Sequence, residues 1–165
     1  MADAEADWVL RVLGIQVPAM AREAERIAPT WMDARFAWTD ANDAVDEQIG
    51  TLREAILARA DIEPEYGPFL SQIADKGLNA ITENYRVKLM AAVMDVGTGS
   101  AVAVSKSGPK ALEQITAFRT FIDGSEKIAV CDANPFGVKV AIRGTLVPAL
   151  DAMASALKAA LAAAP

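Results

Sequence analysis

TWMDARFAWTDANDAVDEQIGTLREAILAR, residues 30–59, is the stretch that decides the fold of this chain. Two rows of residues repeat along it with a period of seven. The first row is Trp31, Trp38, Val45 and Leu52, and the second, four positions on, is Arg35, Asn42, Ile49 and Ile56. Alternating steps of four and three place both rows on one side of an α-helix. The pattern predicts a helix of about 30 residues, roughly 45 Å long, that needs partner helices to cover its stripe.

Pro29 and Thr30 predict where this helix begins. Thr30 is followed three residues later by Asp33, which resembles a capping box, and Pro29 favours a break before it. Ahead of this point, residues 5–13 and 19–28 carry short amphipathic patterns. We therefore expect two short helices before the long one.

A second long helix is predicted over residues 68–96. It follows a loop rich in proline and glycine, and Pro68 suits the first position of a helix. Gly77 in the interior of such a helix costs about 1 kcal/mol relative to alanine. We expect a compensating close approach there to a bulky neighbour such as a tryptophan. Two long helices joined by a tight reversal predict an antiparallel hairpin.

The next part of the chain contains two further helices. For residues 97–108 the pattern leaves two alternatives open, a short extended piece or the continuation of a helix. Pro109 is expected to open a helix that runs through Ile122. Ser125 is expected to cap a short helix that ends at Cys131.

The C-terminal part begins with DANPFG, residues 132–137, which is a turn by composition. Residues 138–162 then place large apolar residues on one helical stripe. Gly144 and Pro148 are expected to kink or interrupt that helix, and Thr145 is available to cap a restart.

These patterns predict one domain over residues 1–165, which is long enough for a substantial core. Its parts are the short helices of residues 1–29, the hairpin of residues 30–59 and 68–96, and the C-terminal helices of residues 109–165. The expected fold class is all-α, an antiparallel bundle of four main helices with two short N-terminal helices.

Composition indicates the cell compartment. The chain has 53% apolar residues but no run of 18, so we expect no membrane span. Its first residues, MADAEAD, are acidic and lack the basic start of a signal peptide. Cys131 is the single cysteine, which suits a reducing compartment. A cytoplasmic location is expected.

Charge is distributed unevenly along the chain. Residues 1–67 hold 14 acidic residues and 6 arginines, a net charge of −8, and residues 68–165 hold 8 acidic and 10 basic residues, a net charge of +2. The two sum to the overall −6. This asymmetry predicts complementary faces, within the fold or between two copies of a homodimer, and the alternative is two ordinary solvated surfaces. Nucleic acid is not expected as a partner, because no basic patch with interleaved aromatic residues is present.

Residue types also limit the chemistry. The sequence has no histidine, which excludes serine–histidine–aspartate and cysteine–histidine catalysis and histidine-based zinc sites. The segment SKSG around Lys106 lacks the glycine spacing of a phosphate-binding loop. Asp40, Asp43 and Glu47 share one helix face and could bind a hard cation weakly, but the pattern favours an acidic solvent face. We expect no cofactor, no metal and no enzymatic activity.

The candidate ligand or partner residues are mostly aromatic or interrupt an apolar row. Arg35 and Asn42 do the latter, which indicates either specification of helix register or a polar network lining a ligand cavity. Trp31 and Trp38 would form the walls of such a cavity. The remaining candidates are Tyr85, beside that cavity, and Phe136, which either fills the core or anchors a partner.

Two stretches, GLNAIT (77–82) and CDANPFGVKVAIRGTL (131–146), are similar to stretches of uncharacterised bacterial helical proteins, a resemblance that implies no activity. The patterns favour a non-enzymatic protein–protein interaction module, such as a scaffold, adaptor or accessory subunit, that also self-associates. The alternatives are a small-molecule-binding helical protein with a tryptophan-lined cavity and an acidic inhibitor or immunity-type protein.

Overall fold

The computed structural model describes residues 19–59, 72–73 and 75–163, and all the regular structure in these ranges is helical. The helices are α2 (Ala19–Leu57), α4 (Asn79–Val96), α5 (Ala101–Gly124), α6 (Glu126–Asp132) and α7 (Ile142–Ala163). The predicted all-α class is confirmed. The short helix predicted at residues 5–13 and the predicted reversal after residue 59 lie outside the described residues.

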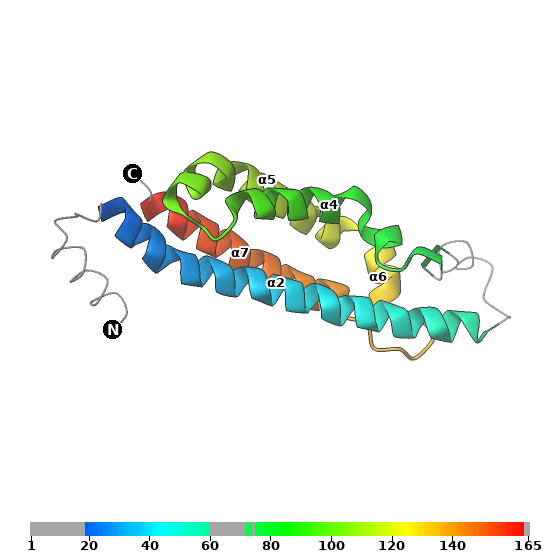
Figure 1. Ribbon diagram of the computed structural model, residues 1–165. Coiled ribbons are helices and arrows are strands. Elements are labelled where there is room, and N and C mark those ends of the chain that lie inside the picture. The colour runs from blue at the N-terminus through cyan, green and yellow to red at the C-terminus, as the bar shows by residue number, and fades with distance from the viewer. Residues whose placement is uncertain (1–18, 60–71, 74, 164–165) are drawn as a thin grey trace.

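The helices form two layers (Figure 1). α2 and α7 lie side by side in one layer, and α4 and α5 pack together in the other. The layers are joined mainly by α5 packing on α7, with α6 touching α7 and α2 making a smaller contact with α5. α7 runs back along α2, and α5 runs back along α4. The backbones of α2 and α4, in contrast, make few close approaches.

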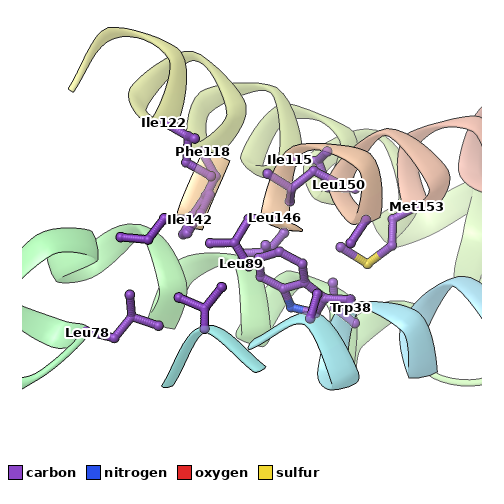
Figure 2. Close-up of a cluster of buried hydrophobic side chains, with 14 of the residues drawn as sticks. Trp38, Leu78, Leu89, Ile115, Phe118, Ile122, Ile142, Leu146, Leu150 and Met153 are labelled. Carbon is purple, nitrogen blue, oxygen red and sulfur yellow. The ribbon is translucent and has the colours of Figure 1, made fainter. Parts of the chain in front are cut away.

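Both predicted rows of α2 face the interior. The first row is fully or almost fully buried, as are the last three residues of the second row, and Arg35 is half-buried. Figure 2 shows Trp38 in the middle of this core, near Leu146 and Leu150 of α7. The Trp38 and Phe118 rings meet edge to face with their centroids 5.7 Å apart. Each large side chain buried in this way stabilises the fold by roughly 1.5–3 kcal/mol.

The predicted break at Pro29 is wrong. α2 continues without interruption through 39 residues, so the short helix expected at residues 19–28 is its first part. Thr30 and Asp33 are exposed residues within the helix and form no capping box. The fixed φ of proline is itself helical, so a proline costs a long helix one hydrogen bond and a local distortion rather than its continuity.

The second long helix is interrupted where the sequence predicted close packing. Gly77 has a φ of 61°, in the left-handed region, and α4 begins two residues later. No atom lies within 4 Å of the position that a Cβ would occupy at Gly77, so the expected approach to a tryptophan is wrong there. That approach occurs instead at Gly99, with a φ of 87°, where a Cβ would lie 2.9 Å from Cδ1 of Trp31.

The open question about residues 97–108 is answered by a turn followed by a helix. Ser100 caps α5, since its Oγ accepts a hydrogen bond from the Ala103 N–H at 3.2 Å. Pro109 therefore lies inside α5 and does not open it. The ring is exposed, as is the residue four positions earlier whose carbonyl it frees, so water can take that carbonyl. The preceding residue, Gly108, is buried and lets Leu161 of α7 approach closely.

The predicted cap of α6 is confirmed, because the Oγ of Ser125 accepts a hydrogen bond from the Ile128 N–H. Asp132 caps the next helix: its carboxylate accepts hydrogen bonds from the N–H groups of Ile142 at 2.7 Å and Arg143 at 3.3 Å. α7 thus begins at Ile142, later than expected.

α7 is continuous, so the interruption predicted as one alternative at Gly144 and Pro148 is wrong, and Thr145 caps no restart. Eight of its residues are buried, and both Gly144 and Pro148 are exposed. Among the described residues α7 is also the one helix long and apolar enough to cross a membrane by length and composition. Buried core helices pass the same test.

Candidate functional site

The sides of α2 and α4 that face each other are separated by a groove with two cavities. One cavity, about 340 Å³ in volume, is named the Met cavity. Its α2 wall is formed by Arg35, Trp38, Thr39, Asn42 and Asp43. Its α4 wall is formed by Arg86, Met90, Val93 and Met94. Three of the predicted candidates, Arg35, Trp38 and Asn42, therefore line one cavity.

The second cavity, about 350 Å³ in volume, is named the Arg cavity. α2 contributes Asp46, Ile49, Gly50 and Arg53, and the start of α4 with the residues before it contributes Lys76, Gly77, Leu78 and Asn79. Arg86 lines both cavities, so the two are adjacent sections of the same groove. Arg86 also forms an ion pair with Asp46, with Nη2 and Oδ2 2.8 Å apart, which links α4 to α2 between the cavities.

The carbonyl oxygen of Gly97, at the C-terminal end of α4, connects α4 to α2. Trp31 donates from Nε1 to this oxygen at 2.9 Å, and Arg35 donates from Nη1 at 2.6 Å. The sequence pattern predicted Trp31 as a wall of a cavity. Trp31 is fully buried and lines neither of the two cavities. Arg35 has no carboxylate partner in the described part of the chain.

Asn42 is buried, with 6% of its surface exposed. Its Nδ2 donates to the Trp38 carbonyl oxygen at 2.8 Å, one turn earlier in the same helix. Its Oδ1 is the one buried side-chain oxygen or nitrogen without a hydrogen-bond partner in the described residues. An unmade hydrogen bond of this kind costs about 1–3 kcal/mol. Asn42 therefore bonds only within its own helix and forms no register-setting pair with another helix.

Tyr85 and Phe136 lie away from the two cavities. The Tyr85 ring stacks on Phe121 with centroids 4.5 Å apart, and it meets Phe118 edge to face. Phe136 is half-buried against the core, and the Arg59 guanidinium lies 5.4 Å from its ring centroid. Of the two interpretations of Phe136, filling the core agrees with this position. Neither side chain contributes to the site around Trp38.

The acidic face of α2 forms no compact carboxylate cluster. Asp40, Asp43 and Glu47 are all exposed, as the solvent-face interpretation expects. Among the described residues no group of three or more acidic or cysteine side chains is placed to hold a metal ion.

Cys131 is a free cysteine that is fully buried in the core. Burial raises the pKa of its thiol to about 12, and the negative charge of the neighbouring Asp132 adds to this rise. The thiol is therefore protonated at neutral pH and unsuited to nucleophilic chemistry.

Sequence reasoning missed the α4 half of the site. The buried row of that helix runs through Leu89, Ala92 and Val96. Met90 and Met94 lie outside that row and are 53% and 67% exposed. Two large apolar residues spaced one turn apart outside the buried row were the available signal.

No protein family, curated protein or solved structure matches this chain.

Proposed function

We propose that this chain is a non-enzymatic protein–protein interaction module, acting as a scaffold, adaptor or accessory subunit, that binds its partner through exposed apolar residues of α4. The observation that carries this proposal is the exposure of Val87, Met90 and Met94, at 68%, 53% and 67%. Steps of three and four residues place them on one helix face. Contiguous apolar surface of this kind is typical of an interaction site, and methionine adapts to varied partners.

The finer architecture that accompanies this proposal is an antiparallel bundle of four main helices. The opposite directions of α2 and α7, and of α4 and α5, support it. We further propose a cytoplasmic protein that forms homodimers, with no nucleic acid and no membrane as partner. The net charges of −8 and +2 on the two parts of the chain support an electrostatic contribution to self-association.

Small-molecule binding is the second candidate function. The Met cavity supports it, because its volume lies in the range of ligand pockets and Trp38, Arg35 and Asn42 provide an aromatic wall with polar groups. An acidic inhibitor or immunity-type role is a further alternative that rests on the −8 of residues 1–67 alone.

The test of the interaction proposal is affinity capture from the native host followed by mass spectrometry. The wild-type chain is compared with Val87→Glu, which alters the exposed apolar face and lines neither cavity. Val102→Glu is the matched control, since Val102 on α5 is 70% exposed. We expect a partner that is retained by the wild type and the control and lost by Val87→Glu. Equal capture by all three chains would contradict a role for α4.

A further inference from the structure

The Arg cavity is positively charged in a chain whose net charge is −6. Arg53, Lys76 and Arg86 line it, against the single carboxylate of Asp46, which is already paired with Arg86. Arg53 and Lys76 are exposed and make no ion pair with a carboxylate in the described part of the chain. Such an arrangement attracts an anionic group, because two cationic side chains converge on one cavity without a counter-charge.

The start of α4 adds to this positive potential. The helix begins at Asn79 beside the cavity, and no side chain caps its first turn. The positive end of the helix dipole therefore lies at the same place as Arg53 and Lys76. This contribution supplements the three side chains and would not define a site without them.

The adjacent Met cavity has a different character. Its α4 wall of Met90, Val93 and Met94 faces Trp38 of α2, so an apolar group can be covered on two sides. Methionine side chains are flexible and adjust to the shape of an alkyl chain. Asn42 in this cavity and Arg53 in the other are separated by roughly 16 Å, from a rise of about 1.5 Å per residue over that part of α2. A cationic section and an apolar section thus follow each other along one groove.

We propose that the α2–α4 groove binds an anionic amphiphile, with a phosphate or carboxylate head group between Arg53, Lys76 and Arg86 and an alkyl chain along Met90 and Met94. An inorganic anion would leave the apolar section empty, and a neutral amphiphile would leave the cations without a partner. The combination of both sections selects a molecule that carries both features. This site shares Met90 and Met94 with the partner surface proposed above, and Val87 belongs to the partner surface alone.

The test uses monomeric decyl phosphate as the probe, titrated by calorimetry below its micelle concentration. Decyl maltoside, with the same chain and a neutral head, and inorganic phosphate are the matched probes. We expect saturable binding of decyl phosphate that is about tenfold or more tighter than that of either matched probe, because each supplies only one of the two contacts. Absence of saturable decyl phosphate binding up to millimolar concentration would overturn the proposal.

Variants locate the binding site. The double variant Arg53→Gln/Lys76→Gln should weaken decyl phosphate binding by about tenfold or more, since it removes two charge-assisted contacts. Lys106→Gln/Lys110→Gln on α5 makes the same change in net charge at exposed positions outside both cavities, and it should bind like the wild type. The changed residues of both variants are exposed, so thermal unfolding midpoints near that of the wild type show that the fold is intact. Equal weakening in the two double variants would mean non-specific attraction and overturn the assignment.

Two further arms separate this proposal from related explanations. Vesicles of phosphatidylglycerol and phosphatidylcholine test adsorption to a membrane, and binding to vesicles without binding of monomeric decyl phosphate would overturn the groove site. Val87→Glu should keep its affinity for decyl phosphate, because Val87 lines neither cavity. Val87→Glu should lose the captured partner and keep its decyl phosphate affinity. Arg53→Gln/Lys76→Gln should keep the captured partner and lose decyl phosphate affinity. These two results together would show that the two proposals are independent.

Discussion

α2 presents two contrasting sides to the rest of the molecule. On its buried side it places Val45 and Leu52, neither of which is exposed, and it packs against α7 along much of its length. Towards α4 the same helix places Arg35, Asp43 and Arg53, and two cavities remain between the helices. One helix can thus form close-packed core and an open groove at once, because the side-chain types on each face decide how near a neighbour comes.

The groove is bridged by specific polar contacts instead of continuous packing. The carbonyl oxygen of Gly97 accepts from Trp31 and Arg35 at one end, and the Arg86–Asp46 ion pair spans the middle. Exposed or partly exposed ion pairs contribute about 1 kcal/mol or less, whereas burial of one large side chain contributes more. The α2–α7 side should therefore dominate stability, and the α2–α4 side should be where binding occurs.

The largest effect is expected from Trp38→Ala, at a residue that belongs to the core and also lines the Met cavity. Removing this buried ring, which meets Phe118, should lower the free energy of unfolding by about 3–5 kcal/mol, measured by denaturant titration. Phe36→Ala on the same helix is the control, because Phe36 is 61% exposed and its removal should change stability by about 0.5 kcal/mol or less. Similar losses in the two variants would show that Trp38 is not part of the core.

A matched pair of glycines compares close contact with open space. Gly99→Ala combines left-handed backbone strain with a Cβ only 2.9 Å from Trp31, so we expect a loss of about 2–4 kcal/mol. Gly77→Ala meets the strain alone, since no atom lies within 4 Å of its Cβ position, and should cost about 1–2 kcal/mol. Thermal unfolding of both variants measures the difference. A larger loss at Gly77 would contradict this placement of Trp31.

Burial of Cys131 in the core should make the stability of the fold depend on pH in the alkaline range. The pKa of its thiol rises from 9.0 to about 12 on folding. Between these values the unfolded thiol has lost its proton and the folded one keeps it, so stability should fall with rising pH by about 1.4 kcal/mol per unit. Cys131→Ala lacks this contribution. The free energy of unfolding of the wild type and of Cys131→Ala is measured below and above pH 9, and the difference between the two proteins separates the effect of the thiol from that of other titrating groups. Parallel curves for both proteins would show an accessible thiol.

The smallest effect is expected on the groove side, from Asn42→Leu. This change removes the unpartnered Oδ1 and its desolvation cost, so stability should stay constant or rise by about 1 kcal/mol in chemical denaturation. Thr39→Val, an exposed neighbour on the same wall, is the control. If Asn42→Leu lowered the free energy of unfolding by more than about 2 kcal/mol, Asn42 would have an additional hydrogen-bond partner, and its side of α2 would contribute to stability as the packed side does.

The sequence by itself determined the helical class and most of the buried positions. The period of seven in residues 31–56 identified the interior face of α2, and similar spacing identified Ile115, Phe118 and Ile122 in α5. Ser125 was recognised as a cap from its position before a short helix. These properties could be predicted because helical periodicity and capping depend on residues within a few positions of each other.

Tertiary structure decided which local signals prevailed. Pro29 and Pro109 each predicted a helix boundary, and Pro148 predicted a kink or an interruption. The helices α2, α5 and α7 nevertheless continue through these prolines. A proline costs a helix about 3 kcal/mol, and the burial of several large residues along α5 and along α7 exceeds that cost. The approach expected at Gly77 occurs at Gly99 for the same reason: which glycine meets a tryptophan depends on how two helices are placed in space. The α2–α4 groove likewise depends on residues more than 20 positions apart, whose proximity no local pattern records.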